Sequence, residues 1–148
     1  MKEVWRDIAG YEGYYKISNL GNIKSLVREV NAGIRHSKTV IKKGRILKSG
    51  YTMDGYDTVC LSKNNIRKTY RVARLVGGHF VDNPENKPQI NHIDGDKHNN
   101  GGINLEWVTA KENTSHAYQS GLINSSAVTK RLEPYFNTRK RGQDGRYY

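Results

Sequence analysis

Residues 89–121 constrain the fold more than any other part of this chain. A short segment with apolar residues, 89–92, precedes a polar loop over 94–102 that is rich in asparagine, aspartate and glycine. A second short segment with apolar residues covers 105–108. Turn-forming residues between two such segments predict a pair of strands joined by a loop. A helix over 110–120 is expected to follow directly, so the region predicts strand, loop, strand and helix in succession.

Both ends of this helix are marked in the sequence. Thr109 and Glu112 have the spacing of a capping box, in which a hydroxyl and a carboxylate bind the free amides of a helix start. Gly121 follows Ser120 and is expected to end the helix.

Two hairpins and a helix are predicted upstream. The paired segments of the hairpins are 14–18 with 23–26, and 56–61 with 66–70. Apolar residues recur at helical spacing over 72–80, which predicts an amphipathic helix. Gly77 and Gly78 each cost about 1 kcal/mol relative to alanine, so we expect the last turn of that helix to be weak or frayed.

Basic residues are distributed unevenly along the 148-residue chain, which has 25 Lys and Arg, 14 Asp and Glu, and a net charge of +11. The net charge is +10 over 24–74 and +4 over 128–148, whereas 75–127 carries −3. Basic flanks around an acidic centre suit a polyanion held on both sides of a cation site. A solvated basic surface explains the charge equally well. The apolar fraction of 35% favours small subdomains or arms over one thick core.

Composition also excludes several classes of protein. No run of about 18 apolar residues is present, and the first ten residues lack the apolar stretch of a signal peptide. Cys60 is the single cysteine, which excludes an intramolecular disulfide and a cysteine-based zinc site. We therefore expect no membrane partner, and a location in a reducing cytoplasm.

One group of residues could carry chemistry. His92 ends the first strand of 89–108, and Asn113 and His116 lie three residues apart on one face of the helix that follows. Further oxygen atoms come from Asn91, Asp94 and Asp96. Such hard or borderline ligands favour Mg²⁺ or a similar ion. The alternative is that His92 is a surface or capping residue and that the asparagines only form turns.

Several stretches of sequence carry a resemblance to a known family. They are Asn91–Asp96, Asn99–Asn100, Asn104–Thr109 and Glu112–Ala117. Together they strongly resemble the HNH motif of phage and intron-encoded homing endonucleases. Upstream, Val4–Ile8 and Gly10–Gly21 resemble the small N-terminal module that often accompanies this nuclease class. The resemblance covers about residues 3–26 and 66–121.

The resemblance implies an α+β architecture with a ββα-metal nuclease core. His92 takes the position of the general base, and imidazole titrates close enough to neutral pH for this role. Asn104 matches the central asparagine, whose family role is to hold the loop and His92 in place. Asn113 matches the third motif position, a metal ligand, and Asn91 stands where a metal-binding aspartate is common. His116 is a ligand, a phosphate contact or helix surface. One Mg²⁺ or Mn²⁺ ion is implied.

The resemblance also suggests a division into parts. We expect a β-rich DNA-binding module over 1–48, the HNH nuclease domain over 49–122 and a basic C-terminal arm over 123–148. Ala73 replaces a histidine that is common in relatives, and Gly77–Gly78 and Gly101–Gly102 replace bulkier residues. These departures lie outside the catalytic positions.

The function predicted from these observations is metal-dependent hydrolysis of phosphodiester bonds in double-stranded DNA by a monomer that nicks. Candidate DNA-binding residues are Lys42, Lys43, Arg45, Arg67, Lys68, Arg71, Arg74, Arg139, Lys140 and Arg141.

Two other functions are compatible with the composition. A non-catalytic DNA-binding protein that keeps the HNH fold would have the same charge pattern. An RNA-binding accessory protein is disfavoured, because no aromatic stacking platform of the usual motif is present.

Overall fold

The computed structural model describes residues 1–31 and 39–123, which divide into two compact units, 1–109 and 110 onward. The elements of the first unit are β1 (Trp5–Asp7), β2 (Tyr15–Ser18), β3 (Ile23–Ser25), β4 (Arg28–Asn31), β5 (Thr39–Lys42), β6 (Arg45–Ile46), β7 (Gly50–Tyr51), β8 (Asp57–Lys63), β9 (Ile66–Arg71), α1 (Val72–Phe80), β10 (Gln89–His92), the 3₁₀ helix η1 (Gly102–Asn104) and β11 (Leu105–Val108). The second unit contains α2 (Ala110–Gln119). No helix among the described residues is long and apolar enough to cross a membrane.

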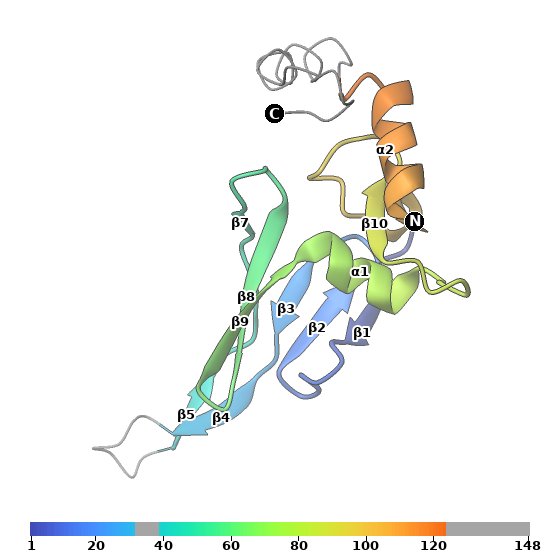
Figure 1. The fold of residues 1–148 in the computed structure, drawn as a ribbon. Coiled ribbons are helices and arrows are strands. Elements are labelled where there is room, and N and C mark those ends of the chain that lie inside the picture. The colour runs from blue at the N-terminus through green and yellow to red at the C-terminus, as the bar shows by residue number, and fades with distance from the viewer. Residues whose placement is uncertain (32–38, 124–148) are drawn as a thin grey trace, which may run out of the picture. The chain divides into compact units, whose positions relative to one another are not determined.

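The N-terminal strands form an antiparallel sheet in the order β1-β2-β3-β6. Figure 1 shows β1, β2 and β3 side by side in this sheet. The hairpin of β2 and β3 confirms the sequence prediction. Strands β1 and β6, which the sequence did not predict, pair along its two sides. Strands β4 and β5, also not predicted, pair with each other as a separate two-stranded sheet.

The second predicted hairpin is present as β8 and β9, and β7 extends it into a three-stranded sheet. Its tight turn contains Asn64 and Asn65, both with positive φ, at 52° and 62°. Two consecutive left-handed residues match the right-handed twist of a hairpin, and asparagine tolerates this conformation better than most residues.

Helix α1 follows β9 without a connecting loop, and its predicted position is confirmed. The helix continues through both glycines to Phe80, and the expected weakness of its last turn stays a prediction. Tertiary packing explains Gly77. A Cβ at position 77 would clash with the side chain of Ile90, so Gly77 lets the helix approach β10 closely. His79 is also fixed, since its Nε2 accepts a hydrogen bond of 3.1 Å from the backbone amide of Ala9.

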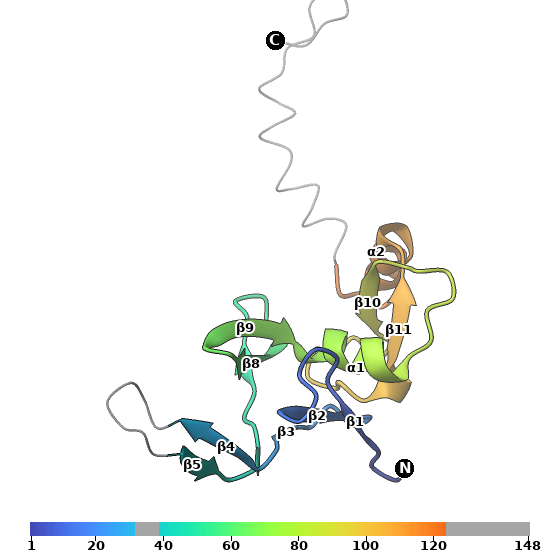
Figure 2. The same cartoon turned by 90° about the horizontal axis from the view of Figure 1, so that it is seen from below.

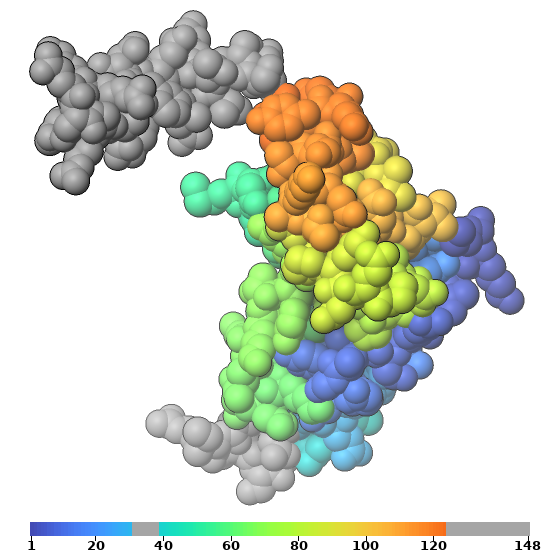
Figure 3. Space-filling view, turned by 45° about the vertical axis from the view of Figure 1, so that its right-hand side comes forward, coloured from blue at the N-terminus to red at the C-terminus, as the bar shows by residue number. Residues whose placement is uncertain are grey.

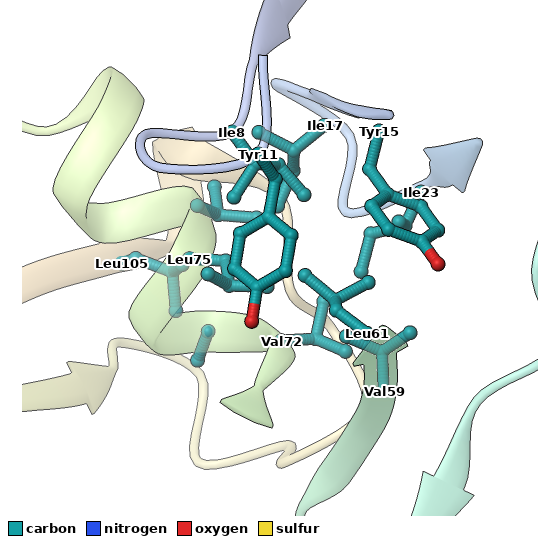
Figure 4. Packing of buried hydrophobic residues seen from close by; sticks show 12 residues of the cluster. Ile8, Tyr11, Tyr15, Ile17, Ile23, Val59, Leu61, Val72, Leu75 and Leu105 are labelled. Carbon is teal, nitrogen blue, oxygen red and sulfur yellow. The ribbon is translucent and has the colours of Figure 1, made fainter. Parts of the chain in front are cut away.

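The hydrophobic core joins the sheets to α1 (Figure 4). Ile17 of β2, Leu61 of β8 and Val76 of α1 are completely or almost completely buried. In the space-filling view, the green β8–β9 residues border the blue N-terminal residues (Figure 3). The core thus draws on both sides of residue 48, and the division at residues 48 and 122 stays a prediction. Residues 124–148, with Arg139, Lys140 and Arg141, lie outside the described residues.

Strands β10 and β11 pair antiparallel, as predicted, with Asn91 opposite Glu106 and His92 opposite Leu105 (Figure 2). Helix α2 ends within one residue of its predicted end, and Gly121 beyond it has a φ of +67°. The strand–loop–strand–helix order and the α+β class are therefore both confirmed.

Candidate active site

His92 is the last residue of β10, and its side chain is buried, with 5% of its surface exposed. Its Nε2 lies 3.2 Å from Oδ1 of Asn100. The ring of Tyr56 lies beside it, with 6.0 Å between the ring centroids. A histidine held by a buried partner at a strand end has a fixed ring orientation, which a surface or capping histidine would not need.

Asn104 fastens the loop between the two strands. Its Nδ2 donates to Oδ1 of Asp94 at 2.8 Å and to the backbone oxygen of Asn99 at 2.9 Å, and its Oδ1 accepts from the Asp94 amide at 3.1 Å. Its backbone oxygen accepts from the Ile93 amide, directly after His92. Hydrogen bonds from Asn104, which has the larger effect, and from Asn99 hold the pKa of the Asp94 carboxyl below its usual range. The amide of Asn104 thus positions the loop next to His92.

The β7–β8 region contributes Asp57, a residue that the sequence did not indicate as part of the site. One carboxylate oxygen of Asp57 accepts from Nδ2 of Asn100 at 2.8 Å. The other lies 2.9 Å from Nδ1 of His98. A third link runs from Nζ of Lys97 to the backbone oxygen of Asp54 at 2.7 Å. The loop that carries Asn100 is therefore tied to a segment about 40 residues earlier in the chain.

The N-terminal turn supports the same loop from another direction. Gly21 has a φ of +88°, and a Cβ there would lie 3.0 Å from Cβ of Asn100 and 3.2 Å from its backbone oxygen. The backbone oxygen of Asn19 accepts a hydrogen bond of 2.8 Å from the Gly102 amide. Glycine at position 21 is required by both backbone conformation and space.

Asn91 is buried and has its amide oriented by the opposite strand. Its Nδ2 donates to Oε1 of Glu106 at 2.8 Å. A carboxylate oxygen only accepts, so the nitrogen must face Glu106 and Oδ1 is the atom available to a cation. Among residues 1–31 and 39–123, no three His, Cys, Asp or Glu side chains form a group that could hold a metal by themselves. An amide oxygen such as Oδ1 of Asn91 suits a hard divalent ion that takes few protein ligands and completes its coordination shell with water and phosphate.

Asn113 and His116 lie on α2, three residues apart, and therefore share a face of that helix. Nε2 of His116 lies 3.3 Å from the Ser120 hydroxyl, one turn later. Because α2 belongs to the second unit, the structure describes this pair and the His92 site separately. A metal site that joins them stays a prediction.

The candidate DNA-binding residues in the described part of the chain are all exposed. They are Lys42, Lys43, Arg45, Arg67, Lys68, Arg71 and Arg74. Successive side chains of a strand point to opposite faces, so residues an even number apart lie on the same face. Arg67 and Arg71 are four residues apart and therefore share a face of β9. Arg71 also pairs with Asp54 at 2.9 Å and lies over the ring of Tyr56, 4.2 Å from its centroid. This places a basic side chain next to the aromatic neighbour of His92.

Comparison with known proteins identifies the family. Residues 3–62 match the model of the NUMOD4 motif. A solved structure described as "DNA binding and cleavage by the HNH homing endonuclease I-HmuI" aligns with 98% of this chain and 76% of that chain, at a TM-score of 0.71 and 32% sequence identity. The chain belongs to the HNH homing endonuclease family. HNH nucleases generally use a divalent metal ion.

Sequence relatives in the HNH family agree with the structural match. DNA endonuclease I-HmuI of Bacillus phage SP01 is 38% identical over 122 residues, which cover 82% of this chain and 62% of that protein. An uncharacterized HNH endonuclease of Acanthamoeba polyphaga mimivirus is 38% identical over 118 residues, 80% of this chain and 31% of that protein. This chain therefore spans less than two thirds of these curated relatives.

Asp57 and Asn100 are the site residues that sequence reasoning missed. Asn100 stands in the quoted HNH stretches, but an asparagine in a polar loop is typical of turns. Asp57 carries no local signal, because its contact with Asn100 joins residues 43 positions apart.

Proposed function

We propose that this protein is a metal-dependent DNA endonuclease that hydrolyses phosphodiester bonds, with His92 as the general base. The observation that carries the proposal is the buried His92 ring, held through Nε2 by Asn100 at the end of β10. The family membership supports the same reaction, since the similar I-HmuI is named as a DNA endonuclease.

In the proposed hydrolysis, His92 acts on the attacking water and the residues around it hold it in place. His92 removes a proton from the attacking water, and its fixed ring needs no reorientation before the reaction. Asn104 and Asp94 hold the loop after His92 through reciprocal hydrogen bonds, so that the strand end keeps its position when DNA binds.

Asn91 and Asn113 would hold one Mg²⁺ or Mn²⁺ ion through amide oxygens, with His116 as a further ligand or a phosphate contact. When bound, the ion supplies positive charge to the scissile phosphate and to the leaving 3′ oxygen. Glu106 orients Asn91 through its hydrogen bond and adds the negative charge that Asn91 lacks.

Exposed basic residues of β5, β6 and β9, with Arg74 of α1, would bind the phosphates of double-stranded DNA. Arg71 lies over Tyr56, the aromatic neighbour of His92. The C-terminal residues Arg139, Lys140 and Arg141 are proposed to add phosphate contacts. One HNH site holds one base and one metal, so we propose a monomer that nicks one strand at a time. The cytoplasm of a bacterium or of a phage-infected host cell is the proposed location.

Cleavage of supercoiled plasmid with Mg²⁺ or with EDTA tests the proposal. We expect open-circular DNA to accumulate before linear DNA in Mg²⁺, at a rate proportional to enzyme concentration, and no product in EDTA. Binding without cleavage under every divalent ion would show instead a DNA-binding protein that has kept the HNH fold. Linear product without a nicked intermediate and a second-order dependence on enzyme would show that two chains act together.

A further inference from the structure

We propose that Asp57 and Asn100 are positioning residues that fix the proton of the His92 ring on Nε2 and leave Nδ1 as the basic nitrogen. The inference rests on the proposed function, because it names the atom of His92 that would accept the proton of water. It extends the site beyond the HNH stretch to β8.

The direction of the Asn100 amide follows from Asp57. A carboxylate has only acceptor atoms, so the Asn100 atom that lies 2.8 Å from Oδ2 of Asp57 must be the NH₂ group. The same nitrogen donates to the backbone oxygen of His98 at 3.1 Å, and a carbonyl oxygen also only accepts. Two independent acceptors therefore turn Oδ1 of Asn100 toward His92.

The tautomer of His92 follows from Asn100. An amide oxygen only accepts, so a hydrogen bond to it at 3.2 Å requires a proton on Nε2. A neutral imidazole carries a single N–H, which leaves Nδ1 with the lone pair. In the described part of the chain, Asn100 is the hydrogen-bond partner of the His92 ring. Nδ1 is thus the nitrogen that remains for water.

The surroundings of Asn100 keep this arrangement from relaxing. Its side chain is buried, and the backbone of Gly21 packs against it so closely that a Cβ would lie 3.0 Å away. The second oxygen of Asp57 is held 2.9 Å from Nδ1 of His98. Both carboxylate oxygens of Asp57 are engaged and the Asn100 side chain is buried, so the direction of these hydrogen bonds is set as long as position 57 carries a carboxylate.

The substitution Asp57→Asn removes the directing charge with almost no change in shape. An amide at position 57 donates as well as accepts, so the Asn100 amide is able to turn over and offer NH₂ to Nε2 of His92. We expect ¹H–¹⁵N spectra of the full chain, recorded at about pH 8 where ordinary imidazole is neutral, to show a protonated Nε2 in the wild type. In the variant, part of the population should carry the proton on Nδ1.

Three further variants make the result specific. Asp7→Asn removes a carboxylate that pairs with Lys16 on the outside of the sheet, and it should leave the His92 signals unchanged. His98→Gln removes the other partner of Asp57 and should also keep the proton on Nε2. Asn100→Ala removes the hydrogen-bond acceptor of His92, so the Nε2 proton of His92 should exchange rapidly with water in this variant. Thermal melting establishes that each protein is folded when its spectrum is recorded.

Kinetics supply the second readout. Asp57→Asn should lower kcat by about 10-fold or more, within the 10²–10⁴-fold that a general base contributes, and leave KM for DNA unchanged. A protonated Nδ1 in the wild type, or His92 signals in folded Asp57→Asn and Asn100→Ala that match the wild type, would overturn the inference. Failure of the wild type to cleave DNA would overturn the proposed function instead, while the protonated Nε2 would still be observed.

Discussion

Residues 89–108 and residues 39–51 differ in how they are held. The first region is fixed by side chains, because Asn91, His92, Asn100 and Asn104 are buried polar residues with partners in the same loop or in neighbouring strands. In 39–51, every residue except Leu47 is exposed, and the short strands are held by backbone pairing.

Under the proposed function, the two regions serve different tasks. A buried network fixes a few atoms within tenths of an ångström, which chemistry at a phosphate needs. Exposed basic strands supply charge, which needs only approximate placement because phosphate attraction acts over several ångströms. Changes in 89–108 should therefore affect catalysis, and changes in 39–51 should affect binding.

The largest expected effect is the dependence of DNA affinity on salt concentration. If six or more phosphates are neutralised, affinity for DNA should fall about 10³-fold between about 50 and 200 mM salt. Replacing both Lys42 and Lys43 with alanine should reduce the slope of log K against log salt by about 1.8, two contacts at about 0.9 each. Fluorescence anisotropy measures both. Lys87→Ala, whose charge lies 3.4 Å from Glu85, serves as the control, and an equal loss of slope there would refute a specific role for Lys42 and Lys43.

Asn104→Ala should produce the next effect by opening the loop. Loss of its hydrogen bonds should lower the free energy of unfolding by about 1–3 kcal/mol and reduce cleavage strongly at unchanged DNA affinity. Ile41→Thr on exposed β5 should change stability by less than about 0.5 kcal/mol. Urea denaturation compares the two, and a more stable Asn104→Ala would contradict the contrast between the regions.

Asn113→Ala should raise the Mg²⁺ concentration needed for half-maximal cleavage by about 10-fold or more, since one ligand is lost from a site with few protein ligands. Asn113→Asp keeps an oxygen ligand at the same place, so its half-maximal Mg²⁺ concentration should be close to that of the wild type. Ser115→Ala on the same helix is the control. If the Mg²⁺ titration of Asn113→Ala matches the wild type, Asn113 does not bind the metal.

The smallest expected effect is the loss of local stability in the 94–104 loop at low pH. Hydrogen bonds from Asn104 and Asn99 lower the pKa of Asp94 in the folded state, so the carboxylate stabilises the fold at a pH above its ordinary range. This contribution is lost as pH falls through the lowered pKa. Hydrogen exchange of the 94–104 amides should therefore accelerate in acid, and Asp94→Asn should flatten that dependence. Equal acid dependence in both proteins would assign the effect to another group.

The two regions also differ in how well their structure could be predicted. The HNH stretch was predictable, because turn residues, a strand pair and a helix with marked ends require particular residue types at fixed spacing. Strands β4 to β7 were not, since exposed residues such as Ile41 and Tyr51 show no alternation between a buried and an exposed face. Asp57 was not predictable either, because a contact made only by folding leaves no mark in the local sequence.

The central claim, that His92 acts as the base in a site built for hydrolysis, is tested most directly by two measurements on one DNA. We would compare the single-turnover nicking rate in Mg²⁺ and the dissociation constant for wild type and His92→Ala. The account predicts a rate at least about 10²-fold lower and an almost unchanged dissociation constant, because a general base acts on the transition state. Nicking at the wild-type rate, or parallel loss of binding and cleavage, would contradict it.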